Sequence, residues 1–495
     1  MTGPDVTEPE DEILVAGRWK RGSGELLRCV DPSDGSTLAR LRGAATTDVE
    51  AAARTAAAAA EEPAWRGMLP HHRARMLTRA GELIEQHAEE LALLQTRNTG
   101  KALAETRALV ASAAGTFRFY AAALETAESS LPQQRGPHLT MSVHEPVGVV
   151  AAITPWNSPI ASDAQKIAPA LAAGNAVLLK PAEATPLISL ALARILQRAG
   201  LPGGLLSVLP GDGATVGDAI VRHPLVRKVS FTGGTSTGRA IARVAADKLM
   251  PLTTELGGKS PTVVFDDADL DQAAAGILYG IFSSSGQSCI AGSRIFLHER
   301  VRDEMTRRLV DGARRLRIGP GTDPGTQVAP LVTHAHRDRV AALVDRAREE
   351  SAEVLCGGGR PDRPELASGA YYCPTLLAGL GNDAKTCQEE IFGPVGALLP
   401  FSDEQDLVEQ ANDTVYGLAC GIWTADYRRA WRVSRRIDAG TVWINTYKQF
   451  SISTPFSGMK DSGLGTEKGR EGIRAYARQK SLYWGLDEEP IPWAE

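Results

Sequence analysis

The pattern of apolar and polar residues changes along the chain and predicts strands first and helices next. Residues 13–42 hold short apolar runs separated by turn sequences, such as Ala16-Gly17 and Asp31-Pro32-Ser33-Asp34-Gly35, which predict short strands. An alanine-rich stretch from about 49 to 60 has high helix propensity, and we expect Thr47 and Asp48 to cap its start. Apolar residues then recur with a helical period between residues 77 and 94.

From residue 147 onward, continuous apolar runs alternate with helical patterns. The predicted strands span 147–153, 176–179, 205–209 and 227–231, and the predicted helices 188–199, 215–222 and 239–248. Apolar strands between helices are typical of a parallel sheet that is covered on both faces. The sequence therefore predicts an α/β fold.

Length, composition and charge narrow the class of protein. A chain of 495 residues exceeds one hydrophobic core and predicts two or three domains. Its 43% hydrophobic and 23% charged residues are ordinary for a globular protein, and a net charge of −5 offers no basic surface for nucleic acid. No apolar run is long enough to cross a membrane, the first residues do not resemble a signal peptide, and the acidic first 12 residues are expected to be disordered.

The six cysteines are scattered, without the spacing of a metal site. They indicate reduced thiols in the cytoplasm, and no metal site is expected.

One segment has the composition of a phosphate-binding turn. The predicted strand 227–231 runs through Gly233-Gly234 to Gly238 and into a helix, so that backbone N–H groups can approach a pyrophosphate. The spacing differs from the usual dinucleotide motif, and an ordinary strand–helix turn also fits it. Lys180 and Glu183 follow another predicted strand, where they can hold ribose hydroxyls or simply lie in a solvated loop.

A carboxylate and a thiol follow, each beside glycines. Glu255 precedes Gly257-Gly258, and Cys289 comes after Gly286. This pair suits oxidation through a covalent thioester, in which cysteine adds to a carbonyl, a cofactor removes hydride and the carboxylate activates water. Taken alone, a single cysteine is more often a buried, unreactive thiol, and an acid near a turn is more often solvated.

From about Ile13 to Trp484 the chain resembles the aldehyde dehydrogenase superfamily. The matching motifs stand in the family's order and spacing. They are Thr154-Pro155-Trp156-Asn157, Lys180-Pro181-Ala182-Glu183, Phe231-Thr232-Gly233-Gly234-Thr235, Glu255-Leu256-Gly257-Gly258-Lys259-Ser260-Pro261, Gly286-Gln287-Ser288-Cys289, Glu389-Glu390-Ile391-Phe392-Gly393-Pro394-Val395 and Pro455-Phe456-Ser457-Gly458.

The resemblance implies a role for each of three catalytic residues. Cys289 is expected to be the nucleophile, Asn157 an oxyanion donor together with the Cys289 backbone N–H, and Glu255 the base that activates the deacylating water. Relatives that transfer the acyl group to coenzyme A commonly lack this carboxylate, so Glu255 favours water as acceptor and a free acid as product. A CoA-acylating semialdehyde dehydrogenase, or a non-catalytic binding or structural protein on the same fold, remains the alternative.

The resemblance also implies a dinucleotide cofactor. Lys180 and Glu183 are expected at the adenosine ribose, and Glu390 at the nicotinamide ribose. An acid at 183 binds ribose hydroxyls and repels a 2′-phosphate, which favours NAD, with NADP possible. The complete expected set is Trp156, Lys180, Glu183, Gly213, Gly217, Gly233, Thr235, Leu256, Glu390 and Phe392.

The resemblance also implies a tunnel through which the substrate reaches the cysteine, and the matching positions here carry mainly small and polar side chains. Two phenylalanines make the opposite wall, so the tunnel is wide and semi-polar and suits a bulky, aromatic or hydroxylated aldehyde, unless loop shifts refill it. Few aromatic residues are left for a cation cage, which disfavours betaine aldehyde. The expected tunnel residues are Ser158, Ala161, Ser162, Gln165, Ser283, Ser288, Ile290, Phe450 and Phe456.

The resemblance implies three structural parts. A Rossmann-type nucleotide-binding domain is expected over residues 1–124 and 146–257, an α/β catalytic domain over 258–461, and a β oligomerisation arm over 125–145 and 477–495. The arm predicts a homodimer or homotetramer. The sequence departs from common family patterns at Gly234, Ser457 and Thr466, and Thr466 precedes Glu467, which some relatives use in proton relay.

Overall fold

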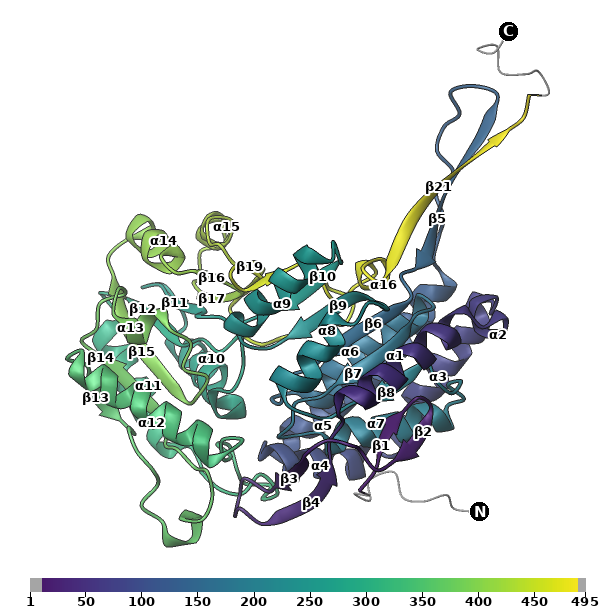
Figure 1. Cartoon of the computed structure of the whole chain (residues 1–495). Coiled ribbons are helices and arrows are strands. Elements are labelled where there is room, and N and C mark those ends of the chain that lie inside the picture. The colour runs from purple at the N-terminus through teal and green to yellow at the C-terminus, as the bar shows by residue number, and fades with distance from the viewer. Residues whose placement is uncertain (1–10, 488–495) are drawn as a thin grey trace.

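The computed structural model describes residues 11–487, which form two α/β bodies and a projecting two-stranded arm (Figure 1). The disorder predicted for the first 12 residues falls largely on residues 1–10, which lie outside the described part. The end of the predicted arm, residues 488–495, also lies outside it. Within the described part, no helix is long and apolar enough to cross a bilayer, and no group of three or more His, Cys, Asp or Glu residues is placed to hold a metal ion.

The first body is built on an eight-stranded sheet in the order β2-β1-β8-β7-β6-β9-β10-β20. Its central strands β8, β7, β6, β9 and β10 are parallel, and every residue of β6 and β7 is buried, as continuous apolar runs predict. The strands span β1 Ile13–Val15, β2 Arg18–Lys20, β6 Val149–Ile153, β7 Ala176–Lys180, β8 Leu206–Val208, β9 Val226–Thr232, β10 Leu252–Glu255 and β20 Gly463–Leu464.

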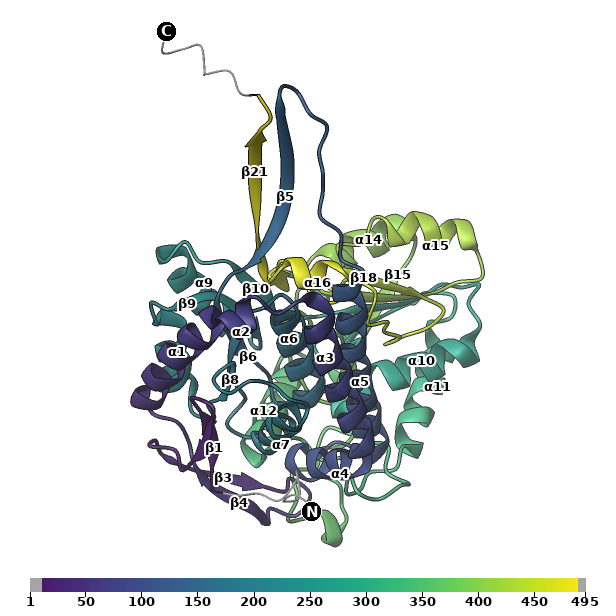
Figure 2. The same ribbon diagram turned by 90° about the vertical axis from the view of Figure 1, so that its right-hand side faces the viewer.

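Helices cover both faces of this sheet, and α5 packs against α3, α4 and α6 (Figure 2). The helices are α1 Thr46–Glu61, α2 Pro63–Arg66, α3 Pro70–Gln86, α4 Ala88–Thr99, α5 Leu103–Glu125, α6 Pro159–Ala172, α7 Leu187–Arg198, α8 Asp218–Arg222, α9 Thr235–Asp247 and α16 Glu471–Arg474.

Several predicted boundaries were wrong in detail. α1 begins earlier than expected, with Ala45 as its N-cap, but Asp48 does help to cap it, because its carboxylate accepts a hydrogen bond from the backbone N–H of Ala45. The same carboxylate accepts from the N–H of Ser23 and pairs with Lys20. The helix expected from 239 begins at Thr235, so the glycine-rich turn is shorter and Gly238 is already helical. The helix expected over 215–222 opens with a π-helical turn, Gly213–Gly217, before α8.

The second body holds a seven-stranded sheet in the order β13-β14-β15-β12-β11-β17-β18, parallel except for β13. Two apolar cores lie against it. Its strands are β11 Pro261–Val264, β12 Arg294–His298, β13 Glu353–Cys356, β14 Thr375–Ala378, β15 Val395–Phe401, β17 Ala419–Trp423 and β18 Thr441–Ile444. Its helices are α10 Leu270–Phe282, α11 Arg302–Arg315, α12 His334–Glu349, α13 Lys385–Gln388, α14 Glu404–Asn412 and α15 Tyr427–Ser434.

The chain crosses between the bodies more than once. β20, late in the sequence, pairs with β10 and so returns the chain to the first sheet after it has built the second. The smaller pairs are β3 Leu26–Val30 with β4 Thr37–Arg42, and β16 Tyr416–Gly417 with β19 Met459–Lys460. The limits given above for the nucleotide-binding domain, the catalytic domain and the arm remain predictions.

The arm consists of β5 His138–Pro146 and β21 Ala477–Gly485, which pair antiparallel along their whole length. Both views show it standing clear of the two bodies (Figures 1 and 2). Tyr483 and Trp484 near its end are exposed.

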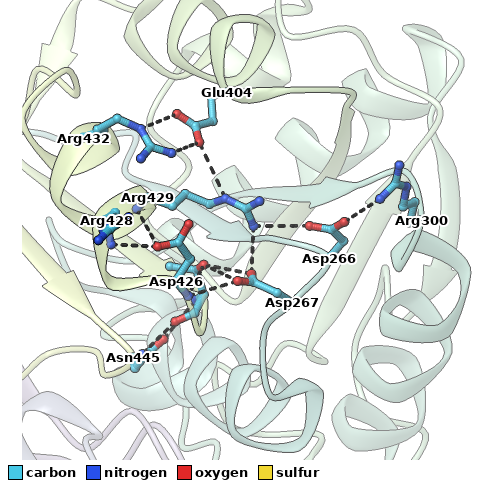
Figure 3. A network of polar contacts seen from close by, with 10 residues as sticks. Asp266, Asp267, Arg300, Glu404, Asp426, Arg428, Arg429, Arg432 and Asn445 are labelled. Atoms are coloured by element: carbon cyan, nitrogen blue, oxygen red, sulfur yellow. Dashed lines mark hydrogen bonds and ion pairs between the residues drawn. The ribbon is translucent and has the colours of Figure 1, made fainter.

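A network of arginines and carboxylates ties α14 and α15 to the carboxyl end of β11 (Figure 3). Arg429 of α15 lies 2.9 Å from Asp267, and Arg300 lies 2.9 Å from Asp266. Glu404 of α14 accepts a hydrogen bond of 2.6 Å from Arg432.

Candidate active site

Cys289 lies in a tightly folded loop that follows α10 and the 3₁₀ turn η2, Ser283–Gly286. Ser284, Ser285 and Gly286 all have left-handed backbone angles, with φ of 57°, 54° and 71°. A Cβ on Gly286 would lie 2.0 Å from the carbonyl oxygen of Gly393, so only glycine fits there. The loop that presents the thiol is therefore fixed by close backbone packing.

Glu255 is the last residue of β10, between Thr232 of β9 and Gly463 of β20. Both of its carboxylate oxygens are buried and have no hydrogen-bond partner within the described residues. The following glycines bring this strand end to the thiol loop, because a Cβ on Gly258 would lie 2.3 Å from the carbonyl oxygen of Cys289. The turn after Glu255 and the loop that holds Cys289 are thus packed closely against each other.

Burial shifts the pKa of both groups upward. Burial, together with the charge of Glu467, raises the pKa of Glu255 well above its usual range. Burial raises the pKa of the Cys289 thiol to about 12; Glu390 and Glu255 add to the rise, and Lys448 and Lys468 oppose it. The thiol is therefore protonated at neutral pH, and it needs a base to take its proton when it reacts.

Asn157 reaches the same loop from the end of β6. Its side-chain amide donates a hydrogen bond of 2.9 Å to the carbonyl oxygen of Gln287, two residues before Cys289. An asparagine amide carries two N–H groups, so a second donor is available to a substrate oxygen.

Behind Glu255 lies a buried ion pair. Lys166 of α6 lies 2.5 Å from Glu467, and Ser230 of β9 donates to the same carboxylate oxygen at 2.8 Å. The sequence pointed to Glu467 but not to Lys166, because its partner lies 301 residues away in the chain.

A cleft of about 790 Å³ opens beside the carboxyl ends of β6, β7 and β9, where ligands of such sheets bind. At its floor a Cβ on Gly233 would lie 2.5 Å from the Phe231 ring, and α9 begins without a side-chain cap, which leaves its N–H groups for a phosphate. The residues present therefore fit a dinucleotide. Six predicted cofactor residues line the cleft: Trp156, Lys180, Glu183, Gly213, Gly217 and Gly233.

The other predicted cofactor residues lie around the Gly257-Gly258 turn. The N–H of Gly257 donates to Thr235 at 3.3 Å, and that of Gly258 donates to Glu390 at 3.0 Å. Burial raises the pKa of Glu390 to about 7, and the Gly258 N–H limits the rise. Leu256 is buried against α9, where a Cβ on Gly238 would lie 2.5 Å from it.

Phe392 has a left-handed φ of 59°, and its ring centre lies 5.2 Å from that of Trp156. His336, which the sequence reasoning missed, lies 2.8 Å from the Phe392 carbonyl oxygen and holds this backbone in place.

The predicted tunnel residues fall into two groups. On α6, the hydroxyls of Ser158 and Ser162 lie 3.0 Å apart, and Ala161 and Gln165 are partly exposed. In the second body, the rings of Phe450 and Phe456 lie 5.6 Å apart. Ser288 and Ile290 flank Cys289; Ile290 is buried in the same apolar core as Phe456, while Ser288 is partly exposed.

Two lysines on this wall escaped the sequence reasoning. Lys448 donates to the Ser283 hydroxyl at 2.8 Å, and the Lys468 ammonium lies 4.2 Å from the Phe450 ring centre. Lys448 stands two residues before Phe450 in the sequence, but neither lysine belongs to a motif that would have singled it out.

Comparison with known proteins decides the family. A sequence model of the aldehyde dehydrogenase family matches residues 19–482. The chain belongs to the aldehyde dehydrogenase family. The expected superfamily, fold and oxidoreductase class are therefore confirmed.

Individual relatives add detail on this aldehyde dehydrogenase. It is 40% identical over 480 residues to a phenylacetaldehyde dehydrogenase of Pseudomonas fluorescens, covering 95% of each chain. A solved NAD⁺ complex of an aldehyde dehydrogenase from Bacillus cereus is 35% identical, with a TM-score of 0.94 over 97% of this chain and 98% of that one.

A betaine aldehyde dehydrogenase of Staphylococcus aureus, also solved with NAD⁺, is 33% identical, with a TM-score of 0.96 over 98% of this chain and 96% of that one. NAD is the cofactor that the family and these complexes support.

Proposed function

We propose that this enzyme oxidises a bulky, aromatic or hydroxylated aldehyde to its carboxylic acid with NAD, through a thioester on Cys289. The observation that carries the proposal is the carboxylate of Glu255, which is buried, has no partner among the described residues and lies close enough to raise the pKa of the thiol. A carboxylate kept free of partners in a dry site is available as a base.

The reaction begins when the Cys289 sulfur adds to the aldehyde carbon and its proton passes to Glu255. The free N–H of Asn157 and the backbone N–H of Cys289 stabilise the negative oxygen; one such donor is typically worth about 3 kcal/mol of barrier. Lys180, Glu183 and the start of α9 would hold NAD in the cleft, where it would supply the hydride acceptor that turns the adduct into a thioester on the sulfur.

Hydrolysis then frees the enzyme. Once Glu255 has released the first proton to solvent, it takes a proton from water, the hydroxide adds to the thioester carbon, and the carbon–sulfur bond breaks to give the acid and the Cys289 thiolate, which is protonated again. Overall, aldehyde, NAD⁺ and water give carboxylate, NADH and protons. Burial raises the pKa of Glu255, and the charge of Glu467 adds to the rise while its partner Lys166 opposes it, so that Glu255 can carry a proton between steps.

The choice between NAD and NADP depends on the side chains at the end of β7. The Glu183 side chain is 54% exposed at the cleft, and the Lys180 ammonium lies 3.5 Å away from its carboxylate. We assign the adenosine ribose to this pair, with NAD preferred because a 2′-phosphate would meet the carboxylate. The remaining cleft residues take the roles that the family resemblance gives them.

Support for an aromatic substrate comes from the wall beside Cys289. The rings of Trp443 and Phe450 lie 5.6 Å apart, and Phe456 continues the row. The relative of 40% identity is a phenylacetaldehyde dehydrogenase. A flat ring therefore has a matching surface in this chain.

We also propose that the β5–β21 arm carries the contacts of a homodimer or homotetramer, since its end exposes Tyr483 and Trp484. The nucleotide-binding domain, the catalytic domain and the arm keep their predicted limits in this proposal. All six cysteines are unpaired thiols, which fits the reducing cytoplasm.

The test is Cys289→Ala. We expect turnover of an aromatic aldehyde to vanish while NAD binding, followed by quenching of tryptophan fluorescence, persists. The matched control is Cys373→Ala, which removes the other partly exposed thiol and should keep turnover. Activity remaining in Cys289→Ala would contradict the proposal. So would NADH formation in the wild type that depends on added coenzyme A, because this outcome identifies the acylating alternative.

A further inference from the structure

Two ammonium groups converge on the Cys289 thiol, and the proposed reaction uses neither. Lys448 donates to Ser283 at 2.8 Å and lies 5.8 Å from the Tyr279 ring centre. Lys468 lies over two rings, 4.2 Å from that of Phe450 and 5.2 Å from that of Phe456. Each acts electrostatically on the thiol. They thus bring two positive charges to the predicted substrate wall.

Desolvation disfavours the charged form of both ammonium groups. Burial lowers the pKa of Lys448 to about 8 and also lowers that of Lys468, so that Lys448 remains mostly protonated at neutral pH. Both residues are partly exposed, and an anion beside either ammonium group would favour its charged form.

No described carboxylate pairs directly with either lysine, although Glu105 acts on Lys448, and Glu467 and Glu255 act on Lys468, from farther away. Across residues 11–487, neither Lys448 nor Lys468 has an ion-pair partner within 4.0 Å, whereas the buried Lys166 has Glu467 at 2.5 Å. The carboxylates that act on them are otherwise engaged. Glu105 accepts from the backbone N–H of Ser284 at 2.6 Å, and Glu467 is held by Lys166.

The third nearby carboxylate, Glu255, is the base of the proposed reaction and has no hydrogen-bond partner among the described residues. Within the described part of the chain, Lys448 and Lys468 therefore lack a direct counter-ion.

We propose that the missing counter-ion belongs to the substrate, which is an aldehyde that also carries an anionic group, a carboxylate in the simplest case, bound between Lys448 and Lys468. This inference rests on the proposed function and narrows its substrate class. The aromatic rings under Lys468 contact the body of the substrate, and the two ammonium groups hold the anionic end away from the reacting carbon. The same charges reject a quaternary ammonium aldehyde.

The experiment compares each carboxylate substrate with its uncharged methyl ester. The probes are 4-carboxybenzaldehyde and the flexible 6-oxohexanoate, each beside its methyl ester, and the measurement is the ratio of kcat/KM for acid over ester. We expect the wild type to prefer the acid of at least one pair by about tenfold or more, because close ion pairs contribute strongly in desolvated sites. In the double variant Lys448→Gln, Lys468→Gln that ratio should fall toward one.

The matched control is Lys385→Gln, which removes an exposed lysine of α13 and should keep the wild-type ratio. A second measurement needs no variant: raising salt to about 0.5 M should lower the wild-type ratio, since salt screens the attraction. A ratio near one for both pairs in the wild type overturns the inference.

Two further outcomes separate the proposals. If the double variant loses activity on acid and ester in proportion and its pH profile moves, the lysines act only on the thiol, and the inference fails. If the esters are oxidised but the acids are not preferred, the proposed function stands and only the inference fails. Oxidation of neither probe type overturns both.

Discussion

Two strands, one in each of the two large sheets, lead to carboxylates that differ in their hydrogen-bond and ion-pair partners. Glu255 closes β10 and has no hydrogen-bond partner among the described residues, and burial raises its pKa. Asp266 and Asp267 directly follow β11 and lie in the network of Figure 3, held by Arg300 and Arg429. Burial acts to raise the pKa of Asp266 too, but His298 and the two arginines outweigh it, and the pKa is lowered.

The comparison teaches that position alone does not make a catalytic carboxylate. Both groups follow buried strands of α/β sheets, where functional residues commonly lie. The partners of the aspartates fix them as structural charges, while the lack of partners leaves Glu255 reactive and lowers stability. The active site is the region where the fold leaves a charge uncompensated.

The largest expected effect comes from Glu255→Gln, which removes the base. We expect steady-state kcat to fall by about 10² to 10⁴, the usual contribution of a positioned base. If Glu255 serves mainly hydrolysis of the thioester, a first-turnover burst of NADH survives, and stopped-flow absorbance at the NADH band measures it. Loss of the burst in proportion would show that Glu255 also takes the thiol proton.

The same variant has a stability consequence with a definite sign. Because the pKa of Glu255 is higher in the folded protein than in the unfolded chain, the wild type loses stability as pH rises above the ordinary carboxyl value of about 4.3. Glu255→Gln has no such loss, so its Tm should exceed that of the wild type at about pH 8 and approach it near pH 5.

Asp266 acts in the opposite sense. Its pKa is lower in the folded protein than in the unfolded chain, so it stabilises the fold above the pKa of the unfolded chain, and this contribution is lost as pH falls.

The next largest effect is on stability and comes from Asp267, one of the two aspartates that pair with arginines. Asp267 accepts from the Thr424 hydroxyl at 2.8 Å, the Asp426 N–H at 3.0 Å and Arg429 at 2.9 Å. Asp267→Ala should cost about 2 kcal/mol of stability, because these partners lose their acceptor. Chemical denaturation measures it.

The matched control for this change is Asp303→Ala, whose side chain is 89% exposed beside Arg302 and whose loss should cost less than about 0.5 kcal/mol. Equal costs for the two variants would remove the distinction between the network and an ordinary surface pair.

The sequence predicted the parts of this enzyme that depend on local chemistry. Continuous apolar runs located β6, β7, β8 and β9 of the first sheet to within about two residues, since burial on both faces requires them, whereas β10 and β20 were not predicted. Glycines around Glu255 and Cys289 indicated close backbone approach, and the Gly258 contact with the Cys289 carbonyl oxygen is its physical form. The start of α1 failed because Asp48 binds a loop from β2 and not only its own helix.

Contacts between distant segments could not be predicted in this way. Lys166 and Glu467 meet only because β20 and the segment after it return to the first body. Lys448 and Lys468 look like solvated lysines in the sequence, and only their contacts with Ser283 and Phe450, without an ion-pair partner, distinguish them. Charge compensation is a property of the folded chain, so no local pattern reports it.

The smallest expected effect concerns the width of the substrate tunnel. It tests whether the active site has unfilled space as well as a carboxylate without a partner. Ser158 begins α6 without a side-chain cap and lies 3.0 Å from Ser162, so Phe at this position costs no capping bond and adds bulk beside the expected tunnel. Ser158→Phe should raise kcat/KM for propanal relative to a bulky aromatic aldehyde by about tenfold, or about 1.4 kcal/mol, because a filled tunnel positions a small substrate better. Ser368→Phe, at an exposed position in the second body, is the control and should leave the ratio of the two substrates as it is. A ratio that stays the same in Ser158→Phe as well would mean that Ser158 does not border the substrate, and the wide tunnel would have to be given up.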